Sequence, residues 1–215
     1  PEGIAELSRG LQQQPTRLSV ADTQQSENIV QLLFEVSPHL RKQALATLLG
    51  HYAPRSCVVF CNTKRACQEV AEYLNELGFG ALALNGDLEQ RERDQVLIRF
   101  TNGSATILVA TDVAARGLDI KELACVINFD ITPDPEVHVH RVGRTGRAGQ
   151  QGLALSLYSP QEAYRVGLIE DYQDAPIVQG TLSELTNKVA PIVPDMVTLN
   201  IAGGRKSKIR AGDIL

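Results

Sequence analysis

The sequence predicts a three-layer α/β sandwich, in which helices cover both faces of a mostly parallel sheet. Short apolar runs alternate along the chain with helical patterns, as in consecutive βαβ units. The runs are almost continuously apolar, which is typical of strands buried on both faces. The 215 residues suffice for one buried core with appendages, and 43% hydrophobic and 21% charged residues are ordinary for a globular protein.

Six apolar runs are expected to form strands. Each is short, rich in aliphatic residues and bounded by polar or glycine-containing segments, which are the marks of a buried strand. The runs are Val30–Val36, Cys57–Cys61, Ala81–Leu84, Ala105–Ala110, Ala124–Phe129 and Leu153–Leu157.

Four helices are expected between and after these strands. Pro38 suits the first turn of one helix, because its missing N–H would have no helical partner there. Thr63 is expected to cap the next helix and Gly78 to end it. Ser159 is expected to cap the last helix. The four segments are Leu40–Leu49, Lys64–Leu77, Glu89–Phe100 and Pro160 to about Tyr172.

Composition excludes several classes of protein. No apolar run approaches the ~20 residues that span a bilayer, and the first residues do not resemble a signal peptide, so a cytoplasmic location without membrane contact is expected. The four cysteines include no C-x-x-C pair and have no histidine at zinc-ligand spacing, so no metal site is expected. The net charge of −4 restricts any nucleic-acid site to a local patch.

The segment from His140 to Gly149 carries the strongest functional pattern. Its arginines recur every third position, interleaved with glycines. Glycine lets the backbone approach a ligand closely, and the planar arginine fork suits phosphate oxygens. A solvated basic loop is the alternative, but it does not explain the spacing. The segment therefore predicts phosphate contact.

Small polar residues follow three of the expected strands. Asn62 with Thr63, Asn85 with Gly86, and Thr111 with Asp112 stand at carboxyl ends, where ligands of open α/β sheets collect. Near them, two side chains three residues apart in a helix share a face and are able to hold a phosphate. These are Gln90 and Arg93; an ordinary charged first turn explains them equally well.

The chain lacks two parts of a nucleotide hydrolase. Neither the G-x-x-x-x-G-K-[ST] phosphate loop nor an Asp-Glu-x-Asp magnesium motif occurs in it. Hydrolysis of a nucleoside triphosphate needs both parts, and this sequence contains neither.

Together these segments resemble the second-domain motifs of the DEAD-box RNA helicases. Val58–Thr63 is similar to motif IV, Gln90 with Arg93 to the Q-x-x-R motif, Ala110–Asp119 to motif V, and His140–Arg147 to motif VI. Order and spacing match across roughly residues 55–150. The segment 86–94 and the glycine- and lysine-rich end look most similar to the bacterial DbpA-type subgroup.

The resemblance implies a RecA-like fold and a division of the chain. Residues 1–22 would be the tail of a preceding RecA-like domain and 23–175 the helicase C-terminal RecA-like domain. A linker would follow over 176–195, and 196–215 would begin an incomplete RNA-recognition-motif-like domain.

The resemblance also assigns roles to single residues. The arginine fingers that reach the γ-phosphate of ATP would be Arg144 and Arg147. The further nucleotide contacts would be Gly117 and Asp119. The RNA-binding residues would be Thr63, Gly86, Gln90, Arg93 and Thr111. The residues that couple the two domains would be Arg116, His140 and Arg141.

The implied activity is ATP-driven unwinding of short structured RNA through closure of two RecA-like domains. ATP with Mg²⁺ would be the cofactor, and the N-terminal RecA-like domain would supply the phosphate loop and the metal site. In the DbpA-type subgroup the RNA is ribosomal, the role is large-subunit assembly, and a C-terminal RNA-binding domain follows. The chain alone is expected to be inactive. A superfamily 2 DNA helicase lobe and a non-catalytic RNA- or partner-binding module remain as alternatives.

Overall fold

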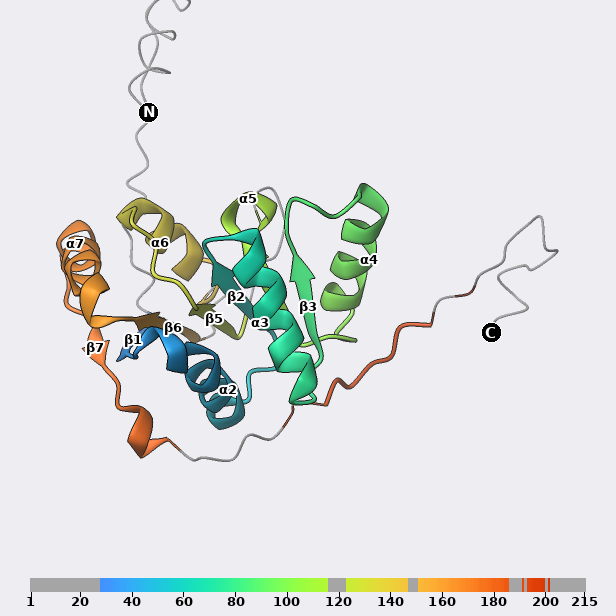
Figure 1. Ribbon diagram of the computed structural model, residues 1–215, viewed down its shortest axis with the longest axis horizontal. Coiled ribbons are helices and arrows are strands. Elements are labelled where there is room, and N and C mark those ends of the chain that lie inside the picture. Colours follow the sequence, from blue (N-terminus) through green and yellow to red (C-terminus); the bar gives the residue numbers. More distant parts are fainter. Residues whose placement is uncertain are drawn as a thin grey trace, which may run out of the picture.

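The computed structural model describes residues 28–115, 123–146, 151–185, 191, 193–199 and 201. Seven strands form one sheet in the order β3-β4-β2-β5-β6-β1-β7, and every pairing is parallel (Figure 1). The strands are β1 (Ile29–Glu35), β2 (Cys57–Cys61), β3 (Ala81–Leu84), β4 (Ile107–Thr111), β5 (Cys125–Asn128), β6 (Gly152–Tyr158) and β7 (Val178–Gln179).

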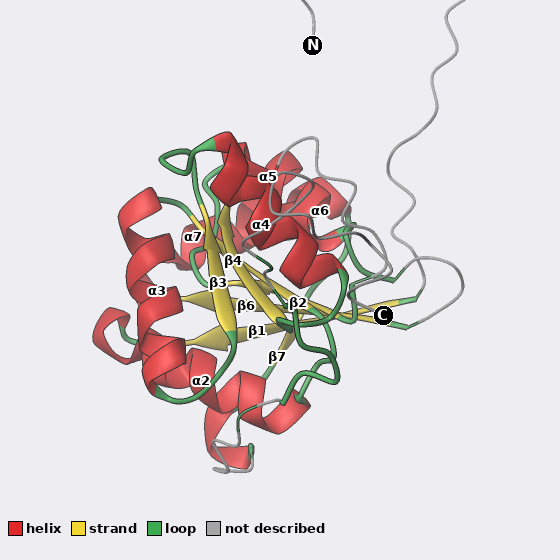
Figure 2. Ribbon diagram, turned by 90° about the vertical axis from the view of Figure 1, so that its right-hand side faces the viewer, coloured by secondary structure: helices red, strands yellow, loops and turns green. Residues whose placement is uncertain are grey.

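Helices cover both faces of this sheet, which confirms the predicted three-layer class. Figure 2 shows α2 and α3 on one side of the strands and α4, α5 and α6 on the other. The helices are α2 (Arg41–Tyr52), α3 (Lys64–Glu76), α4 (Gln90–Thr101), α5 (Asp112–Ala115), α6 (Pro135–Val142) and α7 (Ala163–Gln173). Short 3₁₀ turns lie at η1 (Pro38–Leu40), η2 (Pro160–Glu162) and η3 (Leu182–Glu184).

The alternation of side chains along each strand divides the core into two sides. In β2, Cys57, Val59 and Cys61 pack with α2 and α3, whereas Val58 and Phe60 pack with α4 and α5. Both sets are buried, so the strand is apolar at every position. This explains why the sequence shows continuous apolar runs rather than alternating ones.

Local sequence determines the element boundaries near the site. The Thr63 hydroxyl accepts a hydrogen bond from the Ala66 N–H at 3.1 Å and so caps α3, as predicted. Gly78, with φ +86°, follows the end of that helix. Among the described residues, no helix is long and apolar enough to cross a membrane.

Two helices and one strand were missed by the sequence patterns. The helix α6 begins with the Asp134 carboxylate accepting from the Glu136 N–H and with Pro135 in its first turn, so its start signal was present. Because α6 is helical, His138 and His140 lie on different faces: His138 is buried and His140 is exposed. The other missed elements are α5 and β7.

We predict that Gly152→Ala destabilises the protein. An added Cβ at this position would overlap the backbone nitrogen of Gly146 and lie 2.5 Å from the Thr145 hydroxyl oxygen. Such overpacking costs about 1–3 kcal/mol, measurable by urea unfolding. Gly167→Ala in α7 is the matched control, because its Cβ would meet no atom within 4 Å. That control should stabilise the helix by up to about 1 kcal/mol. Equal stability of the Gly152 variant and the parent would contradict the packing.

A second prediction concerns pH. Burial, and then the nearby Arg141 charge, lower the pKa of His138 from 6.5 to about 4. As the pH falls below 6.5, His138 becomes protonated in the unfolded chain but stays neutral in the folded protein. The free energy of unfolding therefore falls between pH 6.5 and 4. The loss across this window is roughly 3 kcal/mol.

The unfolding free energy of His138→Gln should be measured from pH 7 to pH 4. It should not show the fall of roughly 3 kcal/mol that His138 causes in the parent. His140→Gln is the control on the same helix and should retain it, because His140 is exposed. An identical pH dependence in the parent and in His138→Gln would refute the assignment.

Candidate functional site at the carboxyl edge of the sheet

Four neighbouring strands end at one edge of the sheet and present polar residues there. The strands β3, β4, β2 and β5 are adjacent and parallel, so their carboxyl ends lie together. The three strand ends that the sequence singled out are therefore contiguous, as expected for a ligand edge. A fourth strand end, after β5, contributes Asn128 and Asp130, which the sequence analysis missed. This row of residues is called the carboxyl edge below.

The side chain of Arg141 connects three of these strand ends. Its Nε and Nη2 donate to the two carboxylate oxygens of Asp112, both at 2.7 Å. Its Nη2 also donates to the Asn62 side-chain oxygen at 3.0 Å. Its Nη1 donates to the Asn128 side-chain oxygen at 3.1 Å and to the Asp130 carbonyl at 2.8 Å. These contacts join β4, β2 and β5 to α6.

All five N–H donors of this guanidinium thus have acceptors. The side chain is 2% exposed, and its Cζ lies 5.1 Å from the centre of the Phe60 ring. A buried cation is stable only where charge and hydrogen bonds compensate it, and the bidentate Asp112 carboxylate provides the charge. The interdomain role predicted for Arg141 is not tested, because all of the contacts described above lie within this chain. These contacts show that Arg141 holds the carboxyl edge together.

A hollow of about 300 Å³ opens beside Arg141 at the carboxyl edge. The side chains that line it come from β2, α5 and α6 and from the turn after α6. They are Phe60, Asp112, Ala115, Val137, His140, Arg141 and Arg144. Four of them, Asp112, His140, Arg141 and Arg144, had been singled out from sequence, and the structure brings them to one hollow.

The main chain around Arg144 is fixed by its neighbours. The Arg144 carbonyl accepts from the Leu123 N–H at 3.3 Å, and the Thr145 hydroxyl donates to the Leu123 carbonyl. The Thr145 N–H donates to the Val142 carbonyl at 3.1 Å, which ties the turn to the end of α6. The partly buried Arg144 side chain therefore extends from a rigid support into the hollow. A guanidinium held in this way can contact a phosphate group.

The predicted RNA residues divide into exposed and enclosed positions. Thr63 and Gly86 are exposed, and the Lys64 side chain lies against Gly86, with its Cε 3.3 Å from where a Gly86 Cβ would stand. Thr111 is only 8% exposed at the end of β4. Its side chain therefore contributes little surface at this edge.

Gln90 and Arg93 do not act on a common partner here. The Gln90 amide donates to the Asp94 carboxylate at 2.7 Å, within the same helix. The Arg93 guanidinium reaches the Ala114 carbonyl of α5 at 2.5 Å. Arg93 therefore connects α4 to the segment after β4, and Gln90 stays exposed on the helix surface.

Four predicted site residues lie outside the described part of the chain. They are Arg116, Gly117, Asp119 and Arg147. Residues 1–22 and most of 196–215 lie outside it as well, so the proposed domain division is untested there.

Comparison with known proteins agrees with this geometry. Residues 41–149 match the family model described as the helicase conserved C-terminal domain. The chain is 50% identical over its whole length to the ATP-dependent RNA helicase DbpA of Escherichia coli K12. It spans 47% of that relative, or about half its length.

Solved structures show the same fold. The E. coli DEAD-box protein SrmB, bound to the regulator of ribonuclease activity A, superposes with a TM-score of 0.69 at 29% identity, covering 81% of this chain and 99% of that one. Saccharomyces cerevisiae Dbp5, bound to RNA and ADP BeF3, superposes with a TM-score of 0.76 at 25% identity, covering 86% of this chain and 50% of that one. The chain therefore belongs to the DEAD-box RNA helicases, as the helicase conserved C-terminal domain with its RecA-like fold.

Proposed function

We propose that this chain is the C-terminal lobe of an ATP-dependent helicase that unwinds short structured RNA when two RecA-like lobes close around ATP. One observation carries the proposal. The hollow that contains Arg144 and the exposed strand ends at Thr63 and Gly86 lie on the same rigid carboxyl edge. Nucleotide and RNA bound at this edge would both favour the closed state, and so each would promote binding of the other.

The residues of the hollow fit a nucleotide phosphate. The Asp112 carboxylate would repel an anion, but both of its oxygens are bound by Arg141. Arg144 then faces the hollow from a rigid support, and His140 lies beside it. ATP would supply the phosphoryl group, and the N-terminal lobe would hold it with Mg²⁺, because this sequence has neither a phosphate loop nor an acidic magnesium motif.

Arg144 would stabilise the charge that develops on the transferred phosphoryl group. Its planar guanidinium can meet two equatorial oxygens, and hydrogen bonds to Leu123 and Arg141 already hold the main chain that carries it, so the backbone needs little reorganisation. Arg147, also predicted as an arginine finger, would act from the same segment. His140 and Arg116 would contact the other lobe during closure.

RNA would lie along the part of the carboxyl edge next to Thr63 and Gly86. Thr63, Gly86, Gln90 and Arg93 offer hydroxyl, main-chain, amide and guanidinium donors, which suit phosphate and sugar oxygens rather than base edges. Such contacts would make the lobe indifferent to base sequence. Selectivity for one RNA would come from the RNA-binding domain that 196–215 is proposed to begin.

The finer proposal is a role in assembly of the large ribosomal subunit, in the cytoplasm. Its support is the similarity to a DbpA protein across the whole chain, together with the resemblance to the DbpA-type subgroup. Ribosomal RNA would then be the substrate.

In the full-length helicase, Arg144→Ala should abolish RNA-stimulated ATP hydrolysis. An arginine finger contributes a factor of about 10³–10⁵ in rate, so turnover should fall by at least about 10³. RNA affinity should remain close to that of the parent. Steady-state ATPase assays and RNA-binding titrations measure the two effects.

Lys42→Met is the control, since this partly exposed lysine on α2 pairs with Glu69 away from the hollow. Near-normal turnover in Arg144→Ala would remove the finger assignment. Stimulation of the parent by DNA as strong as by RNA would instead favour a DNA helicase.

Arg141→Met should act on stability. It would leave the half-buried Asp112 carboxylate and the Asn128 and Asn62 amides without their common donor, at a cost of about 3–5 kcal/mol. Denaturant unfolding should show this loss, whereas Arg144→Ala should change stability by less than about 1 kcal/mol. Equal stability losses in the two variants would contradict the division of roles between these arginines.

A further inference from the structure

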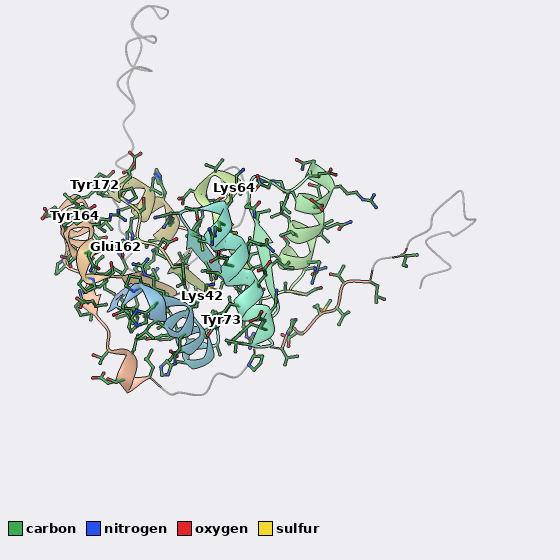
Figure 3. All side chains as sticks on the ribbon, in the orientation of Figure 1. Lys42, Lys64, Tyr73, Glu162, Tyr164 and Tyr172 are labelled. Atoms are coloured by element: carbon green, nitrogen blue, oxygen red, sulfur yellow. The ribbon has the colours of Figure 1, made fainter. Side chains whose placement is uncertain are left out.

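A second arginine reaches the carboxyl edge from outside the hollow. Arg41 begins α2, is 8% exposed, and is absent from the residues that line the hollow. Its Nη1 donates to a carboxylate oxygen of Asp130 at 3.1 Å. Its Nη2 donates to the carboxylate of Glu162, which Figure 3 labels beside Tyr164 near the start of α7. Arg41 therefore connects α2 and η2 to the end of β5.

Asp130 connects Arg41 to the site. Its second carboxylate oxygen accepts from the backbone N–H of Asn62 at 3.0 Å. Its carbonyl accepts from Nη1 of Arg141 at 2.8 Å. The residue thus holds the main chain just before Thr63 and the guanidinium that binds Asp112.

Glu162 in turn orients Arg41. Its Oε2 accepts from the Ser159 N–H at 2.9 Å and from the Ser159 hydroxyl at 2.8 Å. Burial raises the pKa of Glu162, but these hydrogen bonds and the Arg41 charge outweigh it and lower the pKa below its ordinary value. Glu162 therefore stays ionised and keeps the guanidinium of Arg41 directed toward Asp130.

Loss of Arg41 would redirect the Asp130 carboxylate. This side chain is 18% exposed, so without a cation it would keep a poorly solvated charge. Arg141 is the cation nearest along the hydrogen-bond network, since it already donates to the Asp130 carbonyl. A carboxylate that turned toward Arg141 would release the Asn62 N–H and compete with Asp112.

We propose that Arg41 is a positioning residue for RNA-dependent catalysis: through Asp130 it fixes the Asn62 main chain beside Thr63 and the Arg141 guanidinium. The inference rests on the proposed RNA helicase function. It adds a residue of α2, remote in sequence from the helicase motifs, to the machinery of the carboxyl edge.

Arg165 provides a matched control. Its Nη1 donates to the same Glu162 carboxylate at 3.3 Å and to the carbonyl of Ile131, next to Asp130, at 3.2 Å. The structure shows no contact from Arg165 to the Asp130 carboxylate. Arg165→Met therefore removes an arginine from the same cluster without releasing Asp130.

The experiment compares three variants of the full-length helicase: Arg41→Met, Arg165→Met and the double variant Arg41→Met with Asp130→Asn. ATPase rates are measured against RNA concentration, and hydrogen exchange is measured for the peptide that contains Asn62. Arg41→Met should raise the RNA concentration for half-maximal ATPase roughly threefold to tenfold. It should also speed exchange around Asn62, while Arg165→Met changes neither.

The double variant should recover most of the RNA dependence and of the protection at Asn62. An asparagine at 130 still accepts from the Asn62 N–H but carries no charge to compete for Arg141. A purely structural role for Arg41 predicts a double variant no better than Arg41→Met, and that result would overturn the inference.

The test also separates this inference from the proposed function. A parent protein without RNA-stimulated ATPase would refute the function, and hydrogen exchange at Asn62 would still decide the role of Arg41. A stimulated parent in which Arg41→Met and Arg165→Met behave alike would refute the inference alone.

Discussion

The carboxyl edge depends on the burial of one guanidinium. Arg141 is almost fully enclosed, and a charge in that position requires an acceptor for each of its donors. The acceptors come from the ends of β2 and β5, from Asp130 and from the first residue of α5. These segments are distant in sequence, so satisfying one side chain fixes their relative positions. The edge is held in one arrangement, because the loss of any acceptor would leave the buried Arg141 charge uncompensated.

This constraint also gives the edge its electrostatic character. A protein with a net charge of −4 has no general attraction for nucleic acid or nucleotide. The carboxylate of Asp112, in the hollow, and that of Asp130 are each paired with an arginine, Arg141 and Arg41 respectively. Arg144 lies beside the Asp112–Arg141 pair in the lining of the hollow. Specific pairing thus takes the place of an overall basic surface.

Much of the fold could be predicted from sequence. β2 and β3 were predicted at their observed bounds, and the other predicted strands were displaced by one or two residues, because continuous apolar runs on a doubly covered sheet are unambiguous. The order of the strands could not be predicted, since it depends on how the crossovers pack. The missed helix α6 carries polar side chains on the face that contacts the carboxyl edge. These side chains interrupt the helical spacing of apolar residues by which a helix is predicted from sequence.

The candidate site was predicted in part, for similar reasons. Strand-end residues and the arginine pattern mark the edge locally, so Asn62, Thr63 and Arg144 were found. Asp130 and Arg41 were missed because they are 89 positions apart in the sequence. A local sequence pattern cannot show the ion pair that joins them. Arg141 was noticed, but its sequence does not distinguish a ligand-binding arginine from a buried one. Only the set of acceptors around it makes that distinction.

The close approach of Gly152 to Gly146 has a mechanical consequence. The turn that carries Arg144 lies against the first residue of β6 without room for a methyl group, and hydrogen bonds tie it to Leu123. The arginine-bearing turn and the sheet must therefore move as one body. If the proposed closure of two lobes occurs, this lobe would therefore carry Arg144 with it as part of one solid unit, without a separate movement of the turn.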